Sequence, residues 1–511
     1  MITVLAPDLT PSHAGLIAVI AIVVVHLFLR LRYAAKVRRA GGMHAPSLAR
    51  DPFTALSWML RIGRAQVQNR IHEAFRDMFQ NYTTSQIPNA VEINLSGTRR
   101  YIFTQEPSHI KTILTGKFGA FGKGEDFHRV WKPFLGDSIF TTDEQQWQES
   151  RSLIRPMFVK TRLNDVAIFE KCTEVMLSQF PPPGTTFDIQ DLFYRMTIDT
   201  ITAFLLGESV GSLENPRNEF AAAFSEVQRD QMTFQLLMPV EKFIPRGRYK
   251  RGIKVMENFI APFVEKALLL RDDELENMSK SDNNFTFLHA LISHTRNPTV
   301  IRDQIMSVLL AGRDTTAATM SWCLYELARN PKVYTKIREE VIASCGTSRA
   351  PNYEELKNMR YLNHTLNETL RLYPAVPINV RSAKTDSSLA GPNPSHPDIT
   401  VVAGDTIFYS TFLMQRRPDL YPPPSSTFAP VDQFSPDRWE HWQPKPWQFV
   451  PFNGGPRICI GQQFALVEMG FVLSRMMQRY ERIESRDCSG GQFQKVEVVG
   501  CPGRSVKIAA F

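Results

Sequence analysis

One cysteine, flanked by glycines and followed at once by a helical pattern, has the surroundings of a metal ligand. It is Cys459, in the segment FNGGPRICIG at residues 452–461. A cysteine just ahead of a helix N-terminus gains amide donors and a favourable dipole for its thiolate, and glycines let the backbone approach closely. Haem iron bound by one Cys thiolate receives electron density that favours O–O cleavage. The pattern predicts a haem thiolate at Cys459, and the alternative is a buried cysteine in a turn.

A second unusual segment, AGRDTT at residues 311–316, falls in the middle of a long apolar helical pattern. A glycine, an acid and two hydroxyl side chains inside such a helix weaken its backbone ladder and offer groups that relay protons or hold water. Asp314 and Thr315 are therefore candidates for proton chemistry. The structural alternative is a helix kink with a hydrogen-bonded Asp314.

Arginines take part in three weaker patterns. Glu368 and Arg371 are three residues apart on one helical face, and Trp147 and Arg151 lie one turn apart on another. Arg381 follows the first pair in the segment NVR. Each pattern alone is equally typical of solvated side chains, and it gains meaning only beside Cys459.

Together these segments resemble the cytochrome P-450 superfamily. Its haem signature reads F-x-x-G-x-R-x-C-x-G, and every fixed position is met by Phe452, Gly455, Arg457, Cys459 and Gly461. The resemblance implies that Cys459 is the proximal ligand of haem b (iron protoporphyrin IX), held non-covalently apart from the thiolate–iron bond. Arg457 would pair with a haem propionate, Phe452 would shield the sulfur, and Gly461 would belong to the cofactor-binding loop.

The resemblance also assigns roles to the AGRDTT segment and to the scattered arginines. Thr315 would hydrogen-bond the bound dioxygen, and Asp314 would supply protons from solvent. The further cofactor-binding residues, as partners of the haem propionates, would be Trp147, Arg151 and Arg381.

A buried charge cluster is the third implication of the resemblance. Glu368 and Arg371 are followed at the family's distance by Arg438, in the segment FSPDRW at residues 434–439. The three would form a structural triad that holds the haem-side core, since a buried charge trio is tolerated only when it is fully paired.

Helical patterns dominate the elements that must position these residues. Helices are predicted at residues 299–330, 353–373 and 461–480, and short strands at 101–104, 400–402, 406–409 and 496–499. Apolar residues on nearly all faces of the first helix predict that it lies in the core of a helical array. The predicted fold class is mainly α with a small β region, the cytochrome P-450 fold, preceded by an N-terminal transmembrane helix.

Composition and charge exclude several classes of protein. The 511 residues are 43% hydrophobic and 22% charged, which is ordinary globular usage. The six cysteines contain no C-x-x-C pair, which excludes a zinc ribbon and a thioredoxin-type site. The net charge is +8, and five basic residues lie between residues 30 and 39, so the remainder is not typical of a nucleic-acid-binding protein.

The N-terminal segment predicts an uncleaved membrane anchor. Residues 9–29 contain no Asp, Glu, Lys or Arg, and as a helix these 21 residues would span about 31 Å, enough for a bilayer core. Asp8 precedes the segment and basic residues follow it, unlike in a signal peptide, and the basic flank stays cytoplasmic. The alternatives are a buried helix and a cleaved signal peptide. Should the protein stay in the membrane after removal of the anchor, the first candidate for a second contact is 220–243, which is rich in Phe, Leu and Met.

These features define the expected domains and location. We expect a single-pass protein of the endoplasmic reticulum membrane, with a lumenal N-terminus at 1–13, a transmembrane anchor at 14–31, a basic linker at 32–50 and a cytosolic cytochrome P-450 catalytic domain at 51–511.

Several stretches resemble the fungal alkane and fatty-acid hydroxylases of this superfamily, namely 117–124, 134–140 and 150–158. Gln415 and Glu149 depart from that branch, which more often has histidine there. The resemblance implies a monooxygenase that uses O2 to hydroxylate a lipophilic substrate, an alkane or fatty-acyl chain at or near its end. Fungal enzymes of this type also tailor polyketides, terpenoids and other secondary metabolites, and this is the alternative function.

The chain lacks an electron source of its own, since it has no G-x-G-x-x-G segment and no iron–sulfur cysteine set. The expected partner is therefore NADPH-cytochrome P-450 reductase, with cytochrome b5 left open, and no nucleic acid is expected to bind. Rival readings are a haem-thiolate sensor without turnover and an isomerase or dehydratase on the same fold. The intact Asp314–Thr315 pair argues against the sensor, because binding alone needs no proton delivery. It argues against the isomerase or dehydratase because such an enzyme would more often have lost the pair.

Overall fold

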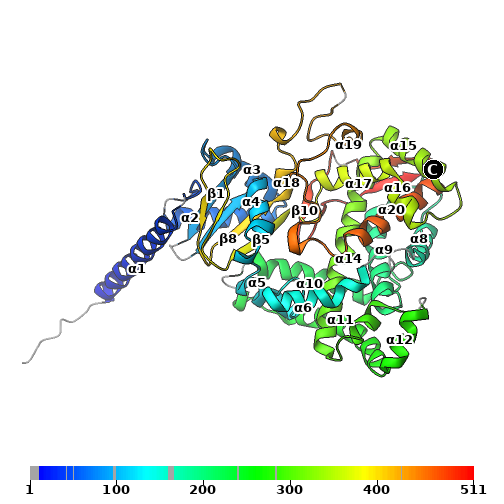
Figure 1. Ribbon diagram of the computed structural model, residues 1–511, viewed down its shortest axis with the longest axis horizontal. Coiled ribbons are helices and arrows are strands. Elements are labelled where there is room, and N and C mark those ends of the chain that lie inside the picture. The colour runs from blue at the N-terminus through cyan, green and yellow to red at the C-terminus, as the bar shows by residue number, and fades with distance from the viewer. Residues whose placement is uncertain are drawn as a thin grey trace, which may run out of the picture. The chain divides into compact units, whose positions relative to one another are not determined.

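The computed structural model describes residues 11–41, 43–49, 51–95, 99–158, 166–236, 238, 241–281, 285–426, 428–488 and 490–511. Over these ranges the chain is mainly helical with small sheets, as the sequence predicts (Figure 1). The predicted catalytic domain and the segment before it divide into two compact units. The sheet unit comprises Met1–Ala65, Glu73–Gly122 and Val380–Tyr409, and the helical unit comprises Gln66–His72, Lys123–Asn379 and Ser410–Phe511.

A five-stranded sheet in the order β1-β2-β8-β5-β3 forms the centre of the sheet unit. Its strands are β1 (Ala90–Leu95), β2 (Arg99–Thr104), β3 (Phe121–Gly122), β5 (Ile378–Ala383) and β8 (Thr406–Ser410). β1 pairs antiparallel with β2, and β2 pairs parallel with β8, so that Tyr101 lies opposite Thr406. β5 and β8 come late in the chain, which explains why this unit combines N-terminal and C-terminal segments.

The other elements of the sheet unit are a short strand pair and the N-terminal helices. They are β6 (Ser387–Leu389), β7 (Ile399–Val401), α1 (Pro11–Arg39), α2 (Pro52–Val67), α3 (Ile71–Asn81) and α4 (Pro107–Lys111). The predicted anchor at 14–31 lies within α1, and residues 1–10 lie outside the described part. Across the described residues, no helix combines the length and the apolar character that a membrane crossing requires.

The helical unit contains most of the helices and two small sheets. Its helices are α5 (Glu125–Leu135), α6 (Glu144–Ile154), α8 (Ala167–Ser178), α9 (Ile189–Leu206), α10 (Glu219–Leu236), α11 (Gly247–Leu268), α12 (Asp272–Ser281), α13 (Phe287–Ile292), α14 (Pro298–Leu327), α15 (Pro331–Cys345), α16 (Tyr353–Asn358), α17 (Arg360–Leu372), α18 (Thr411–Met414), α19 (Arg438–His441) and α20 (Gln462–Arg479). One sheet joins β4 (Phe187–Asp188), β12 (Lys507–Ala510) and β9 (Ile483–Ser485), and the other joins β10 (Gln494–Val496) to β11 (Gly500–Pro502).

The long helix α14 forms the core of this unit and contacts α9, α17 and α20 (Figure 1). Its start is set by Asn297, whose side chain accepts the amides of Thr299 and Val300, and by Pro298 in the first turn. The helix ends at Leu327, shortly before Pro331. Most of its residues are buried, which confirms the prediction of a core helix.

Two predicted elements differ from the structure. The helix predicted at 353–373 is two helices, α16 and α17, because Met359 between them has a non-helical ψ of 89°. The strand predicted at 496–499 is wrong in extent, since these residues form the end of β10 and the turn of a hairpin with β11. Alternating valines there are typical of a strand, but the antiparallel pairing of Gln494 with Pro502 places the turn among them.

Candidate functional site

A tight loop presents Cys459 immediately before α20. The amide of Cys459 donates to the carbonyl of Phe452 at 2.9 Å, which closes the loop. Gly455 has a φ of +63°, which favours glycine. At Gly454 a Cβ would lie 2.6 Å from the ring of Trp447, so only glycine fits there without a shift. The glycines therefore serve the turn and a close approach, as their spacing suggests.

The side chain of Cys459 is both accessible and enclosed by protein. It is exposed, as is the neighbouring Ile458, yet burial raises the pKa of its thiol. The thiol is therefore accessible at its surface, while the protein atoms around it disfavour its charged form. The amide of Gly461 and the charge of Arg151 lower the pKa of the thiol but do not outweigh burial.

Arg457 contacts an acid and an indole ring. Its guanidinium lies 2.6 Å from a carboxylate oxygen of Asp143, donates to the carbonyl of Thr142 at 2.9 Å and lies 4.7 Å from the ring centroid of Trp147. Asp143 also accepts the amides of Lys123 and Gly124. Sequence reasoning missed Asp143, although an Asp directly before a helix is a typical N-terminal signal.

The remaining predicted propionate partners occupy different places. Arg151 donates to the carbonyl of Ile458 at 3.1 Å, next to Cys459, and lies 5.9 Å from the ring of Trp147. Burial and the charge of Arg155 lower the pKa of Arg151. Arg381 is on β5 in the sheet unit, buried, with its guanidinium donating to the carbonyl of its neighbour Val380.

Most of the middle of α14 is buried, but a few of its residues keep partial exposure. Between residues 303 and 324, the residues that keep partial exposure are Ala311, Gly312 and Thr315. Ala311 and Thr315 are four apart and share a face, and the Thr315 hydroxyl donates to the Ala311 carbonyl at 2.7 Å. A Cβ at Gly312 would lie 2.6 Å from Cδ1 of Ile201, so the glycine admits α9 closely. The helix therefore presents the Thr315 hydroxyl on its partly exposed face.

Asp314, the residue before Thr315, is buried, and it lies on a different face of α14. Its carboxylate lies 3.1 Å from the guanidinium of Arg313, which also donates to Ser225 on α10 and stacks between two aromatic rings. Burial raises the pKa of Asp314, and the charge of Arg313 and the amide of Gln228 only partly oppose this. Burial therefore makes Asp314 easier to protonate than an ordinary aspartate.

A polar cleft of about 400 Å³ runs beside this pair. It is lined by α9, α10, α14 and the β10–β11 hairpin, and the members with titratable side chains include Asp188, Asp191, Tyr194, Arg229, Arg313, Asp314, Lys495, Glu497, Cys501 and Arg504. The cleft is open, so it connects the buried Asp314 with solvent. The sequence did not predict that hairpin and α10 residues form a cleft beside Asp314, since no local pattern marks this contact.

The predicted triad is brought together and closed off. Glu368, Arg371 and Arg438 are fully buried, with Glu368 oxygens 2.8 Å from Arg371 and 3.3 Å from Arg438. Glu368 also accepts from the amide of Ser435 and from the indole of Trp439. Burial alone would raise the pKa of Glu368, but these charges and donors hold it below its ordinary value.

Gln415, where the resembling branch more often has histidine, links the triad to the cysteine loop. Its side chain donates to the carbonyls of Leu370 and Arg371 and accepts the amide of Val450. The glutamine therefore supplies both donors and an acceptor at a buried junction.

Glu468 on α20 is a buried acid that sequence reasoning missed. Burial raises its pKa to about 8, and the hydroxyls of Thr200 and Thr316 partly oppose this. These neighbours place α20 against α9 and α14, so the helix that follows Cys459 packs beside the AGRDTT segment. An acid in an apolar helical pattern is the signal that could have identified it.

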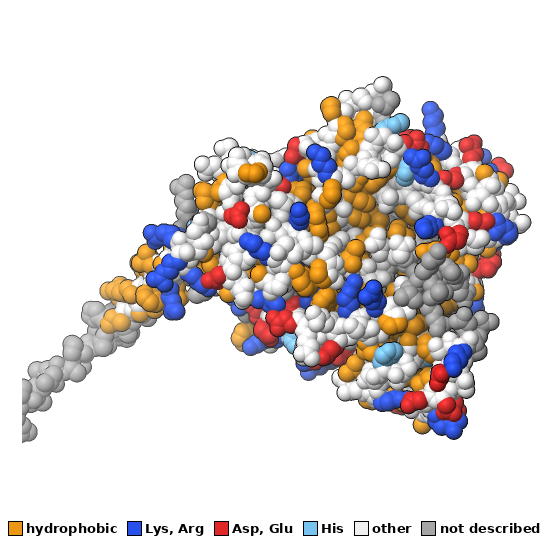
Figure 2. Space-filling model, in the orientation of Figure 1, with side chains coloured by type: hydrophobic (Ala, Val, Ile, Leu, Met, Phe, Trp, Pro, Cys, Tyr) orange, Lys and Arg blue, Asp and Glu red, His pale blue; other side chains and the backbone are white. Residues whose placement is uncertain are grey.

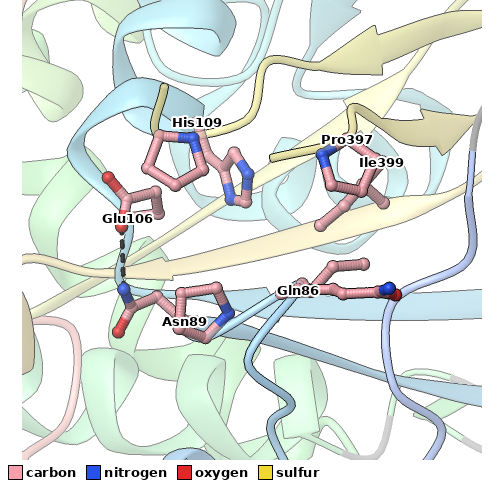
Figure 3. A pocket seen from close by; sticks show the side chains of 9 residues that line it. Gln86, Asn89, Glu106, His109, Pro397 and Ile399 are labelled. Carbon is pink, nitrogen blue, oxygen red and sulfur yellow. Dashed lines mark hydrogen bonds between the residues drawn. The ribbon is translucent and has the colours of Figure 1, made fainter. Parts of the chain in front are cut away.

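The sheet unit has a second, much smaller cavity, shown in Figure 3. It offers about 10 Å³, room for one water molecule, and Asn89 donates to Glu106 across it at 2.8 Å. This space is too small for an organic substrate.

The residues around Cys459 fit a haem. The thiol is accessible, and Arg151 and Arg457 close to it in the structure or the chain supply cations that suit carboxylates. All six cysteines are described and none is in a disulfide, so Cys459 is free to act as a ligand.

Comparison with known proteins gives one consistent result. The family model described as "Cytochrome P450" matches residues 51–495. "Cytochrome P450 monooxygenase pvhE" of Talaromyces variabilis is 46% identical over 432 residues, which covers 80% of each chain. "Cytochrome P450 52A13" of Debaryomyces hansenii is 36% identical, and the match covers 76% of each chain. "Cytochrome P450 52A1" of Candida tropicalis is also 36% identical, and the match covers 75% of this chain and 73% of the relative.

Proposed function

The chain belongs to the cytochrome P450 family and is a monooxygenase, and from this premise we propose that it hydroxylates an alkane or fatty-acyl chain at or near its end. The family implies a haem-thiolate cofactor, and we propose that it is haem b with Cys459 as the iron ligand. The Cys459 loop carries the proposal, because it holds an accessible thiol inside the protein directly before α20. Trp147, Arg151 and Arg457, which all belong to the helical unit, would hold the propionates.

The bound haem supplies reductive activation of dioxygen for insertion of one oxygen atom into a C–H bond. This chain's residues supply protons and order. Asp314 holds a proton in a buried place, receives it from the polar cleft and passes it inward. Thr315 presents a hydroxyl at the opening of α14, where it can exchange its bond to the Ala311 carbonyl for one to the reacting oxygen. Glu368, Arg371 and Arg438 hold the surrounding core.

The substrate class rests on the resemblance of residues 117–124, 134–140 and 150–158 to alkane and fatty-acid hydroxylases. The second candidate is a tailoring oxidase of fungal secondary metabolism acting on a polyketide, terpenoid or other product. The name of the 46% identical relative states a monooxygenase and no substrate, so both candidate functions are tested in the same assay. A sensor without turnover fits less well, since a cleft leads solvent to a buried acid.

We further propose that NADPH-cytochrome P-450 reductase, with or without cytochrome b5, supplies the electrons at the endoplasmic reticulum membrane. Support for attachment there is the row of exposed apolar side chains on α1, Leu16, Ile17, Ile20, Val23, Val24, Val25, Leu27, Phe28 and Leu31 (Figure 2). The proposed arrangement is residues 1–13 in the lumen, 14–31 in the bilayer and 32–511 in the cytosol. Removing residues 2–31 should release the protein while leaving the site intact.

The test combines the full-length protein with a reductase, NADPH and a panel of alkanes, fatty acids and fungal extract. Mass spectrometry should detect products 16 mass units heavier, and the class of substrate converted decides between the candidates. Cys459→Ser is the matched control, because a serine oxygen is a much poorer ligand for the iron. The reduced wild-type protein with carbon monoxide should show a red-shifted Soret band, and the variant should not. If the variant keeps that band, Cys459 is not the ligand.

A further inference from the structure

An aromatic pair stacks in the core of the helical unit, between α14 and the end of α17. The rings of Trp322 and Tyr373 are parallel to within 1°, and their centroids are 3.9 Å apart. Tyr373 follows α17 directly, and Trp322 is buried at 1% exposure. Aromatic rings that only pack prefer an offset or edge-to-face arrangement with centroids about 4.5–7 Å apart. Packing preference alone therefore does not account for this close, parallel contact.

The indole of Trp322 carries a cost that a phenylalanine would avoid. Its N–H group has no hydrogen-bond partner among the described residues, although the side chain is buried. A buried donor without a partner loses the hydrogen bond that it makes to water in the unfolded chain. The property that an indole has and a phenyl ring lacks is that it gives up an electron readily. Trp322 is therefore a candidate for redox chemistry as well as for packing.

The phenol of Tyr373 is coupled to a proton acceptor. Its hydroxyl donates to a carboxylate oxygen of Glu326, on α14, at 2.6 Å. Burial raises the pKa of Glu326, and the Tyr373 hydroxyl only partly opposes this, so the carboxylate is a stronger base than an ordinary one. The guanidinium of Arg416 lies 5.5 Å from the centroid of the Tyr373 ring, where it disfavours a positive charge on that ring. Tyr373 is therefore arranged to lose an electron together with its hydroxyl proton.

The pair connects the proposed dioxygen site with partly exposed side chains. Trp322 comes seven residues after Thr315, which places it on the same face of α14 to within about 20° and about 10 Å further along the axis. Tyr325 meets the ring of Trp322 edge-on, with centroids 5.7 Å apart. Tyr325 and Tyr373 both keep partial exposure. Electrons from solution can therefore reach the buried indole through either phenol.

We propose that Trp322 and Tyr373 form an electron relay that protects the protein when its haem is oxidised in the absence of substrate. The relay rests on the haem proposed at Cys459 and adds a redox function to substrate hydroxylation. A peroxide, or dioxygen with two electrons from the reductase, leaves the haem site two electrons short when no C–H bond is oxidised. An oxidised haem damages itself and nearby side chains unless an internal donor supplies those electrons.

Each transfer through the relay moves one electron and one proton. Trp322 gives an electron to the haem site, Tyr373 replaces it, and the O–H bond of Tyr373 breaks as its proton passes to Glu326. This leaves a haem site reduced by one electron, a neutral Tyr373 phenoxyl radical and a protonated Glu326. A small soluble reductant such as ascorbate then gives an electron to the radical, and Glu326 returns the proton. The relay acts a second time for the second electron, and solvent supplies the protons that complete water at the haem.

The first test locates the radical. Full-length holoprotein without substrate or ascorbate is mixed with cumene hydroperoxide and the nitrone spin trap DMPO, and peptide mass spectrometry finds the adduct. The wild type should carry it on Tyr373. Trp322→Phe keeps a ring in place but removes the readily oxidised indole, so the adduct yield on Tyr373 should fall several-fold. Tyr334→Phe is the matched control, since Tyr334 is a buried tyrosine of the same unit that donates to a backbone carbonyl, at 2.8 Å, and it should leave the yield unchanged.

Glu326→Gln separates proton transfer from packing. Glutamine still accepts a hydrogen bond from the Tyr373 hydroxyl, but it does not take up the proton. The adduct yield on Tyr373 should therefore fall several-fold, while unfolding in urea stays close to that of wild type. An unchanged yield would overturn Glu326 as the proton acceptor.

Protection is measured as the rate at which the Soret band is lost during incubation with the reductase, NADPH and ascorbate in the absence of substrate. Trp322→Phe and Tyr373→Phe should lose the band several-fold faster than wild type and Tyr334→Phe. Equal rates in all four proteins would overturn the protective role.

The spectrum of the reduced protein with carbon monoxide separates failure of this inference from failure of the proposed function. Wild-type protein without the red-shifted Soret band would overturn the haem at Cys459. Wild-type protein with the band, but with adducts only on residues other than Tyr373, would overturn the relay alone. The same holds if Trp322→Phe keeps the wild-type yield on Tyr373.

Discussion

Two buried acid–arginine clusters of the helical unit differ in what surrounds the acid. Glu368 has two arginines, a backbone amide and an indole around it, and its pKa is lowered. Asp314 has one neighbouring arginine and a polar cleft, and its pKa is raised by burial. The same pair of residue types therefore lowers the pKa of the acid in one place and leaves it raised in the other.

The difference teaches how to separate a structural pair from a functional one. A buried carboxylate whose oxygens all accept hydrogen bonds is poorly placed to take up or release a proton. Its role is structural, because it fixes Arg371 and Arg438, which in turn donate to backbone carbonyls. An acid that is short of donors and opens to solvent can change its protonation state. The predictions below test this distinction in order of expected effect.

Glu368→Gln should have the largest effect, on folding. It leaves the charges of Arg371 and Arg438 buried without their anion, which costs about 3–5 kcal/mol. Stability would be measured by urea unfolding and by the yield of haem-loaded protein. Asp437→Asn is the matched control, because its pair with Lys336 is half exposed and worth at most about 1 kcal/mol. Equal stability in the two variants would contradict the structural role of the triad.

Thr315→Ala should separate electron use from product formation. Without the hydroxyl, NADPH oxidation should stay within several-fold of wild type, hydrogen peroxide release should rise, and product should fall roughly ten-fold or more. Thr319→Ala is the control, since Thr319 makes the same type of hydrogen bond, to the Thr315 carbonyl, one turn further along α14. Unchanged coupling of NADPH to product in Thr315→Ala would remove Thr315 from proton delivery and favour the sensor reading.

The sequence predicted the local parts of this site better than the assembled parts. The Cys459 loop and the Glu368–Arg371 pair are short patterns, and glycine spacing or a helical offset is enough to find them. Asp143, Gln228 and the β10–β11 hairpin lie far away in the chain, and they meet the site only through packing. No local periodicity encodes such contacts, so the sequence could not identify the cleft that serves Asp314.

The same reason explains the differences in the fold. Burial of α14 followed from its composition, because apolar residues on all faces leave it no solvent side. The division into two units could not be predicted from composition. It depends on β5 and β8 joining the same sheet as strands that lie about 300 residues earlier in the chain. The exposure of Phe53, Leu56, Leu60 and Val67 on α2 could not be predicted, because apolar residues at a helical spacing predict a buried face equally well.

Asp314→Asn should slow the whole catalytic cycle by several-fold without uncoupling it. Asn keeps the shape but cannot transfer a proton from the cleft, so NADPH oxidation and product formation should fall together. The solvent deuterium isotope effect on the residual rate should increase. Glu497→Gln, in the same cleft but paired with Lys495 at 2.6 Å, is the control and should stay near wild type. A variant with wild-type rate would show that protons reach the site by another route.

The smallest expected effect concerns how stability depends on pH, where the two acids should act with opposite sign. The folded pKa of Glu368 is lowered, so its contribution is present above the unfolded pKa and is lost as pH falls through the folded pKa. The folded pKa of Asp314 is raised, so its contribution is complete below the unfolded value of about 3.9 and is lost as pH rises through the folded pKa.

Urea unfolding of wild type and Asp314→Asn, from about pH 4.5 to 8, isolates the Asp314 contribution, because asparagine does not titrate. Each unit by which the folded pKa is raised is worth about 1.4 kcal/mol at the acid end. The stability of wild type relative to the variant should therefore decline as pH rises and then level off once Asp314 is ionised in both states. Parallel curves would mean that Asp314 keeps an ordinary pKa, and a rising difference would mean that Arg313 fixes its charge, as the triad arginines fix that of Glu368. Either result would remove the distinction between the closed and the open cluster.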